Sequence, residues 1–119
     1  MAKIAILGLG TVGSGVAEVL SKNAASIEKK AGEPVTVKYI LGRHDYPDSP
    51  WNHLVVKDFS IIENDPEVTV VAECIGGATL AYQYVRRCLE AGKNVVTSNK
   101  ELVAEKGLEL TTLARKKGV

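Results

Sequence analysis

The stretch KIAILGLGTVGSGVAEVL, residues 3–20, decides which fold the sequence predicts. It begins with a short apolar run, Lys3–Leu7, which is long enough for a strand and stops at a glycine. The residues after the glycines place apolar side chains at the spacing of one helix face: Val12, Val16, Val19 and Leu20. The stretch therefore predicts a strand, a tight turn and a helix, and we expect this helix to occupy residues 11–32.

The turn in this stretch carries the motif GLGTVG, a GxGxxG pattern that begins at Gly8. Between a strand and a helix, Gly8 permits the tight turn, Gly10 lets the backbone approach a pyrophosphate, and Gly13 lets the helix pack closely on the strand. The amide groups of Thr11 and Val12 would face the phosphates at the positive end of the helix dipole. The motif predicts a dinucleotide-binding turn, although a glycine-rich packing turn would have the same pattern.

Strand-like and helix-like segments alternate along the rest of the chain. The expected strands are VTVKYIL (35–41), HLVVKDF (53–59), VTVVAECI (68–75) and KNVVTS (93–98). The expected helices are TLAYQYVRRCLEAG (79–92) and a last helix that follows Asn99 and ends before Gly118. This order predicts an α/β fold of the Rossmann type, a doubly wound parallel sheet in three layers with right-handed crossovers. We expect one dinucleotide-binding domain over residues 1–119, without the later strands of the full domain.

Composition excludes several classes of function. The chain has 119 residues, 45% of them hydrophobic, which suits one domain with a real core. Fifteen basic and fourteen acidic residues leave a net charge of +1, so nothing favours a nucleic acid or an anionic membrane as partner. The apolar run at the N-terminus is too short for a membrane span and has no signal-peptide layout. We expect a cytoplasmic protein.

The two cysteines, Cys74 and Cys88, lie far outside CxxC spacing, and no histidine is near either in sequence. We therefore expect no metal site and two reduced packing residues. Cys74 falls near a strand end, which leaves a nucleophilic role open, although no neighbour in sequence would activate it.

The end of the second expected strand reads LGRHD, and it bears on the choice of cofactor. NAD-selective domains usually carry an acid there that holds the ribose 2′-hydroxyl. Here Arg43 takes the place nearest the strand end and Asp45 comes later, so a 2′-phosphate would meet a guanidinium. The corner favours NADP over NAD. A solvated turn arginine, with Asp45 reaching a 2′-hydroxyl, is the alternative.

Two further strand ends should share the same ligand-binding edge. The segment CIGGA places Ile75, Gly76 and Gly77 just after the strand over residues 68–75. The first and fourth strands flank the point where the sheet order reverses, so two glycine-bearing turns would face one crevice. Glu73 is a charge inside this apolar strand and must reach the crevice or find a partner.

The segment SNK lies at the end of the fifth expected strand, the next along that edge. Ser98 or Asn99 is expected to cap the last helix. Lys100 then stands in the first helical turn, where a cation is unfavourable by about 0.3–1 kcal/mol relative to an acid. We expect this lysine to point at the nicotinamide end of a cofactor and its hydride acceptor; the alternative is a solvated lysine.

Three segments resemble the amino-terminal, nucleotide-binding part of homoserine dehydrogenases: GLGTVGSGVAEVL, VVAECIGG and YVRRCLEAGKNVVTSNKELVAEKGLEL. That family interconverts L-homoserine and L-aspartate 4-semialdehyde with NAD(P) in threonine and methionine biosynthesis. The resemblance implies a 2′-phosphate role for Arg43 and a nicotinamide-side or substrate-side role for Lys100. It implies cofactor contacts for the glycine motif: Gly8, Gly10, Thr11, Val12 and Gly13. Because the two later turns lie at the same edge, we also expect cofactor contacts from their residues: Ile75, Gly76, Gly77, Ser98 and Asn99.

The sequence departs from the family pattern at two places and is much shorter. Ser98 stands where the family more often has alanine, and GGATLAY lacks a proline that commonly follows the glycine pair. The family's catalytic lysine and aspartate, its substrate-binding carboxylate and its dimerisation region lie farther along a longer chain. We therefore expect no catalytic residue in this chain beyond Lys100, binding of cofactor at most, and a homo-oligomeric intact enzyme.

Two other functions fit parts of the sequence. An aspartate-semialdehyde or dihydrodipicolinate reductase would share the first glycine turn but should not share the Asn99–Lys100 corner. A nucleotide-sensing regulatory module would more typically carry an acid at the place of Arg43.

Overall fold

Five parallel strands form one sheet in the order β3-β2-β1-β4-β5. The computed structural model describes residues 2–8, 11–43, 46–75, 77–97 and 99–119, with the backbone alone at residues 2, 11 and 12. The strands are β1 (Ala2–Leu7), β2 (Val35–Leu41), β3 (Val55–Val56), β4 (Val68–Glu73) and β5 (Asn94–Thr97). The chain runs outward from β1 to β3 and then returns to add β4 and β5 on the other side of β1. The predicted doubly wound parallel sheet is confirmed, with the reversal of strand order between β1 and β4.

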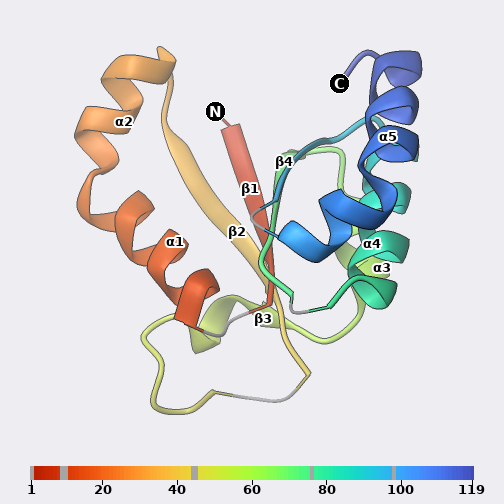
Figure 1. Ribbon diagram of the computed structural model, residues 1–119. Helices are drawn as coiled ribbons and strands as arrows, with labels where there is room; N and C mark the ends of the chain where they lie inside the picture. The colour runs from red at the N-terminus through yellow and green to blue at the C-terminus, as the bar shows by residue number, and fades with distance from the viewer. Residues whose placement is uncertain (1, 9–10, 44–45, 76, 98) are drawn as a thin grey trace.

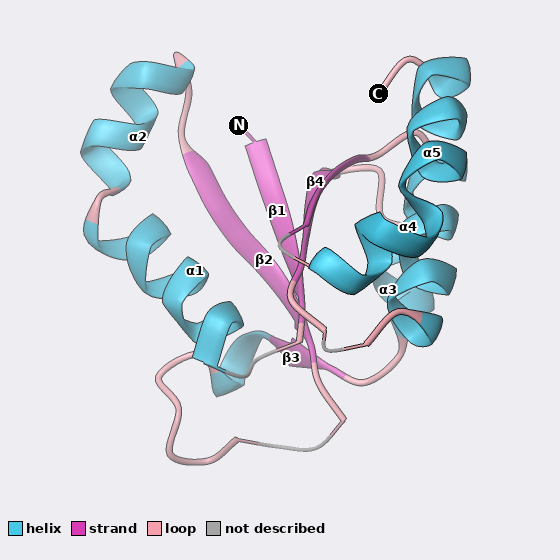
Figure 2. Ribbon diagram, viewed as in Figure 1, coloured by secondary structure: helices cyan, strands magenta, loops and turns pink. Residues whose placement is uncertain are grey.

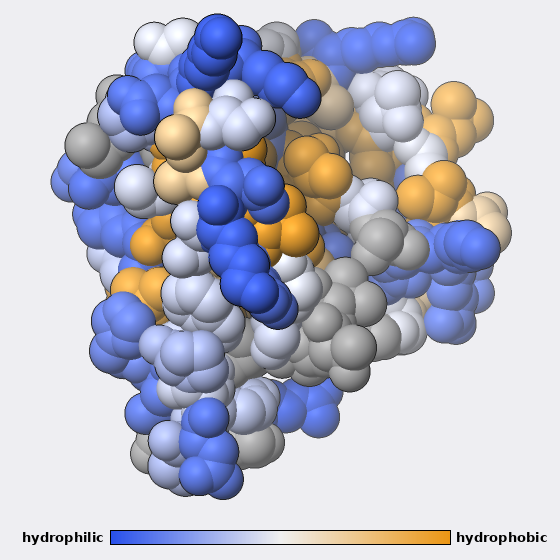
Figure 3. Space-filling model, turned by 90° about the vertical axis from the view of Figure 1, so that its left-hand side faces the viewer, coloured by the Kyte–Doolittle hydropathy of each residue, from blue (hydrophilic) through white to orange (hydrophobic). Residues whose placement is uncertain are grey.

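Helices cover both faces of this sheet, as Figures 1 and 2 show. They are α1 (Thr11–Lys22), α2 (Ala24–Ala31), α3 (Phe59–Glu63), α4 (Thr79–Glu90) and α5 (Lys100–Lys117), with a 3₁₀ turn, η1, at Asn52–Leu54. The helices α1 and α2 lie on one face, and α3, α4 and α5 lie on the other. The space-filling view of the first face shows hydrophilic side chains around small apolar areas (Figure 3). In the described part of the chain, no helix is long and apolar enough to cross a membrane.

The core follows the alternation of side chains along the central strand. Ala5 and Leu7 point to the face that α3 and α4 cover, whereas Ile6 points to the face that α1 covers, and all three are fully buried. The run over residues 68–75 was expected at the centre of the sheet; its strand, β4, is interior, and β1 occupies the middle position. Such two-sided burial is typical of parallel sheets and explains the continuous apolar runs in the sequence.

Two sequence-based boundaries are wrong. The helix expected over residues 11–32 is two helices that meet at Asn23, whose side chain donates to the carbonyl of Val19 at 3.2 Å. Asparagine favours helix ends because its amide competes for backbone partners. The strand expected over residues 53–59 is only two residues long, because Asp58 already caps α3 by accepting from the Ser60 amide at 2.9 Å.

Candidate functional site

The carboxyl ends of the strands meet at one edge of the sheet, and backbone hydrogen bonds join them beyond the strands themselves. The Gly8 amide donates to the carbonyl of Leu41 at 2.9 Å, and the Cys74 amide donates to the carbonyl of Leu7 at 2.9 Å. On the outer side, Gly42 donates to Val56 at 3.0 Å. The ends of β1, β2, β3 and β4 therefore form one continuous backbone surface.

Gly8 and Gly13 have the roles that the motif predicts. Gly8 adopts φ +95°, a conformation that side chains disfavour, and a Cβ there would lie 3.1 Å from the carbonyl oxygen of Cys74. A Cβ on Gly13 would lie 1.9 Å from the carbonyl oxygen of Gly8, which no real contact allows. Gly13 is thus what lets α1 pack directly on the end of β1. Gly10 and the side chains of Thr11 and Val12 lie outside the described part, but the backbone of α1 begins at Thr11, next to this turn.

A cleft of about 500 Å³ opens beside the turn at Gly8. Among the residues predicted to bind cofactor, Gly8, Arg43 and Ile75 line it. The other lining residues are Leu41, Gly42, Tyr46, Lys57, Cys74, Leu80 and Tyr84. The cleft therefore lies between the ends of β1, β2 and β4, at the reversal of the strand order, where open α/β sheets bind ligands.

Sequence reasoning missed Lys57 and the apolar wall of the cleft. Lys57 directly follows β3 and lies at the same edge as Arg43, so two cations line one side. The signal was the Asp58 cap, which ends the strand before the lysine. The wall includes Tyr84, which stacks on Phe59 with ring centroids 4.3 Å apart. The sequence places Tyr84 on the apolar side of a helix, but it does not show which surface that side borders.

The turn after β4 is held against the β5–α5 corner by Asn99. The Asn99 Oδ1 atom accepts from the Leu102 amide at 3.0 Å, so Asn99 is the N-cap of α5, one of the two caps that the sequence offered. Its Nδ2 donates to the carbonyl of Ile75 at 3.1 Å and to that of Gly77. Gly77 adopts φ +81° in this turn. Gly76 and Ser98 lie outside the described residues.

Lys100 is the first residue of α5 and its side chain is exposed. It follows a strand end at the same edge as Gly8, since all five strands are parallel. Asn99 keeps the start of α5 close to Ile75 and Gly77. Lys100 itself, together with Gly13, Gly77 and Asn99, is outside the wall of the cleft.

Glu73 finds partners instead of reaching the cleft. The side chain is 1% exposed. One carboxylate oxygen accepts from the Ile75 amide at 2.6 Å, and the other accepts from the Thr97 hydroxyl at 2.7 Å. These two bonds connect the last residues of β4 and β5.

Neither cysteine is activated. Burial, and then the neighbouring Glu73, raise the pKa of the half-buried Cys74 thiol. Burial raises the pKa of Cys88 to about 12. Both thiols therefore stay protonated at neutral pH, as packing residues do. Within the described ranges, no cluster of histidine, cysteine and carboxylate side chains could hold a metal ion.

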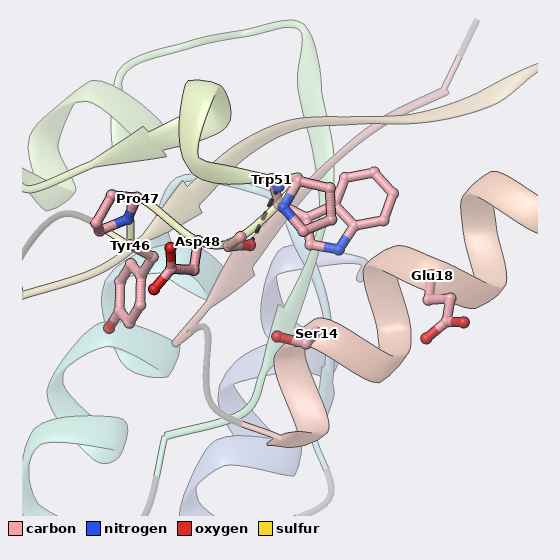
Figure 4. Close-up of a pocket in the computed structure, with 8 residues that line it drawn as sticks. Ser14, Glu18, Tyr46, Pro47, Asp48 and Trp51 are labelled. Atoms are coloured by element: carbon pink, nitrogen blue, oxygen red, sulfur yellow. Dashed lines mark hydrogen bonds between the residues drawn. The ribbon is translucent and has the colours of Figure 1, made fainter.

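A second hollow, of about 580 Å³, lies between α1 and the loop over residues 46–51 (Figure 4). Ser14 and Glu18 line it from α1, and Asp48 and Trp51 line it from the loop. Trp51 also packs against the core cluster that contains Ile6. The Glu18 carboxylate in its wall is paired with Lys22 at 2.5 Å.

Comparison with known proteins agrees with this geometry. Residues 8–119 match the family model "Homoserine dehydrogenase, NAD binding domain". The chain belongs to the homoserine dehydrogenase family. As its NAD-binding domain, the chain takes a nicotinamide dinucleotide as ligand.

Curated homoserine dehydrogenases resemble nearly the whole chain. The Pseudomonas aeruginosa homoserine dehydrogenase is 44% identical over 119 residues, which cover 98% of this chain and 27% of that protein. The Bacillus subtilis homoserine dehydrogenase is 38% identical, with coverage of 98% and 28%. The chain therefore spans about a quarter of the length of these relatives.

Solved structures of the family have the same fold. A crystal structure of S. aureus homoserine dehydrogenase superposes with a TM-score of 0.89 at 34% identity, covering 99% of this chain and 31% of that one. The structure of the Thiobacillus denitrificans homoserine dehydrogenase gives 0.88 at 36% identity, covering 99% of this chain and 28% of that one. The Rossmann-type fold of this homoserine dehydrogenase domain is thus the fold of the family.

Proposed function

We propose that this chain is the cofactor-binding part of an enzyme that interconverts L-homoserine and L-aspartate 4-semialdehyde by hydride transfer, with NADP preferred over NAD. The cleft between the Gly8 turn and Ile75 carries the proposal, because it lies at the reversal of strand order beside the N-terminus of α1. The residues present fit a dinucleotide: Gly8 has φ +95°, and a Cβ there would lie 3.1 Å from the carbonyl oxygen of Cys74, so glycine suits the tight turn that a pyrophosphate would approach.

Each part of the dinucleotide has a proposed partner. The pyrophosphate would lie on the backbone of the GLGTVG turn, from Gly8 through Gly10 to the amides of Thr11 and Val12, with Gly13 fixing the helix behind it. The adenosine half would lie beside the end of β2, where Tyr84 and Leu80 offer apolar surface. The nicotinamide half would lie toward Ile75, Gly76, Gly77 and the Ser98–Asn99–Lys100 corner. A bound nicotinamide supplies the hydride or receives it.

The preference for NADP rests on Arg43 and Lys57. Both line the cleft at the ends of neighbouring strands, β2 and β3. A guanidinium can bind a 2′-phosphate in a bidentate manner, and an ammonium adds a second positive charge. Asp45, the acid that could select NAD, lies outside the described residues.

The chemistry of the complete enzyme belongs to the same proposal. Lys100 would act at the nicotinamide or substrate side, and acid–base groups and substrate-binding carboxylates would come from regions that this chain does not contain. A homo-oligomeric enzyme in the cytoplasm is the assembly and location that we propose with it.

The proposal is tested by titrating the chain with NADPH and with NADH and following cofactor fluorescence. We expect saturable binding of both, with NADPH at least about tenfold tighter, since a charge-assisted contact contributes about 1.5–3 kcal/mol. Absence of binding to either would overturn the proposed cofactor role. Equal affinities would overturn the NADP preference alone.

Turnover is tested in a chimera that joins this chain to the remaining part of the Pseudomonas aeruginosa relative. We expect homoserine-dependent reduction of NADP, and a loss of about a hundredfold in kcat on Lys100→Ala if the amine acts beside the reacting atoms. The neighbouring exposed Lys106→Ala serves as control. A chimera that folds and binds cofactor without turning over homoserine would contradict the substrate assignment.

A further inference from the structure

We propose that Glu73 is a positioning residue for the nicotinamide half of the cofactor, acting through Thr97 and Asn99. The inference rests on the proposed cofactor role of the cleft. It starts from a charged group that the motif does not explain: Glu73 is 1% exposed at the last position of β4.

The carboxylate of Glu73 is the centre of a chain of hydrogen bonds. It accepts from the Ile75 amide at 2.6 Å and from the Thr97 hydroxyl at 2.7 Å. The Thr97 hydroxyl oxygen accepts in turn from the backbone amide of Asn99 at 3.0 Å. Asn99 then donates to the carbonyls of Ile75 and Gly77 and caps α5 at Leu102. Ile75 is thus bound at both its amide and its carbonyl by one network.

This network continues where the sheet ends. The pair Glu73 and Thr97 is the last of the β4–β5 register. Beyond it, the turn at Ile75–Gly77 and the corner at Asn99–Lys100 are joined by these side chains. Both segments have proposed roles at the nicotinamide half, so their relative position should depend on Glu73.

The adenosine half has a different support. The turn at Gly8 and the end of β2 are joined by the backbone bond from Gly8 to Leu41. Arg43 and Lys57 follow β2 and β3, away from the β4–β5 pair in the sheet order. A change in the Glu73 network should therefore alter binding of the nicotinamide half more than binding of the adenosine half.

Three substitutions test this dependence. Glu73→Gln keeps the shape but removes the negative charge and replaces one acceptor oxygen with an NH₂ group, so the bonds to the Ile75 amide and the Thr97 hydroxyl lose their charge-assisted strength. Thr97→Val is isosteric and removes the hydroxyl. Thr97→Ser keeps the hydroxyl and should restore the wild-type behaviour.

A fourth variant controls for loss of stability. Lys93 is 4% exposed, and its ammonium donates to the carbonyls of Asp65 and Val68 at 2.7 Å each. It therefore lies at the start of β4, at the opposite edge of the sheet. Lys93→Met should lower the melting temperature without changing the site.

The measurement compares NADPH with 2′-phospho-ADP-ribose, which lacks the nicotinamide ring and keeps the ribose that carried it. For Glu73→Gln and Thr97→Val we expect NADPH affinity to fall about tenfold and the affinity for 2′-phospho-ADP-ribose to change less than about twofold. Thr97→Ser and Lys93→Met should leave both affinities within about twofold of wild type. Equal losses for the two ligands, or no loss for NADPH, would overturn the positioning role.

Amide hydrogen exchange tests the same network without cofactor. In Glu73→Gln we expect faster exchange at the Asn99 and Leu102 amides than in Lys93→Met at equal global stability. Unchanged exchange at these amides would overturn the inference even if the cofactor binds. A wild-type chain that binds neither ligand would instead overturn the proposed function. Hydrogen exchange alone would then decide whether Glu73 stabilises the start of α5.

Discussion

Hydrogen-bonded charged side chains are present at both ends of the sheet, but they have different roles there. At the amino end, Asp65 accepts from Lys38 at 2.5 Å, from Tyr39 at 2.8 Å and from the Glu67 amide at 2.9 Å. These groups form hydrogen bonds with one another. At the carboxyl end, Glu73 orders backbone turns around a cleft that has cations in its wall. The comparison teaches that this fold uses charge for stability at one end and for ligand geometry at the other.

The largest effect should come from adding a methyl group at Gly13, where α1 lies closest to the backbone of the Gly8 turn at the carboxyl end of the sheet. Gly13→Ala would place a Cβ 1.9 Å from the carbonyl oxygen of Gly8. We expect the free energy of unfolding to fall by about 3 kcal/mol, because backbone must move to admit the methyl group. Urea unfolding measures the change.

Gly15→Ala, in the same helix, is the matched control. A Cβ there meets nothing within 4 Å, so this substitution should stabilise the helix by about 0.5–1 kcal/mol. If the two variants were equally stable, close packing at Gly13 would not limit the fold.

The next effect separates ligand binding from stability. Arg43→Ala should weaken NADPH binding by about tenfold to a hundredfold and change NADH binding less than about twofold, since the guanidinium would contact the 2′-phosphate alone. Lys57→Ala should weaken NADPH by a smaller factor, because an ammonium is a point charge without the bidentate fork. Fluorescence titration measures both. Equal losses for NADPH and NADH would remove the phosphate role.

The amino end should instead control the dependence of stability on pH. Lys38, followed by Tyr39 and the Glu67 amide, lowers the pKa of Asp65 to about 2 from an ordinary value of 3.8. A depressed carboxyl pKa gives stability that is present above about pH 4 and is lost as pH falls toward 2. Asp65→Asn removes this contribution, so its unfolding free energy should vary less with pH in that window. Lys38→Met should flatten the same part of the curve, and an acid limb unchanged in both would contradict the pairing.

The smallest effect concerns the helices that cover the amino half. Arg87 makes two bonds to Glu63, at 2.8 and 2.6 Å, and its guanidinium lies 4.7 Å from the centre of the Phe59 ring. Because Arg87 is half exposed, Arg87→Ala should lower stability by about 1 kcal/mol or less. Arg86→Ala is the control: Arg86 pairs with Glu90 at 3.4 Å, and loss of this pair should lower the free energy of unfolding by about 0.3–0.5 kcal/mol. A larger loss at Arg86 would reverse the expected order.

The parts of the molecule that the sequence predicted are those with local signals. The turn at Gly8 and the helix behind Gly13 follow from glycine spacing between a strand and a helix, because their constraints act within a few residues. The Asn99 cap was one of two options and follows from a polar residue before an apolar helical run. The alternation of segments predicted a doubly wound parallel sheet with the first and fourth strands at the reversal of strand order, and the structure has both features.

The parts that the sequence did not predict depend on distant partners. The bond from Thr97 to Glu73 spans 24 residues, so the sequence shows a buried charge but not its partner. Lys57 was missed because the preceding strand was expected to continue through it, whereas Asp58 starts a helix there. Asn23 interrupts a helical pattern whose apolar spacing alone predicts one helix.

The backbone bonds from Gly8 to Leu41 and from Cys74 to Leu7 have a consequence for how such domains diverge. They fix the shape of the dinucleotide cradle without using any side chain, whereas the cations beside it extend from exposed positions after β2 and β3. We therefore expect an acid in place of Arg43 to weaken NADPH binding relative to NADH binding with little change in the free energy of unfolding. In this architecture, selectivity can evolve by point substitution on an inherited and unchanged support.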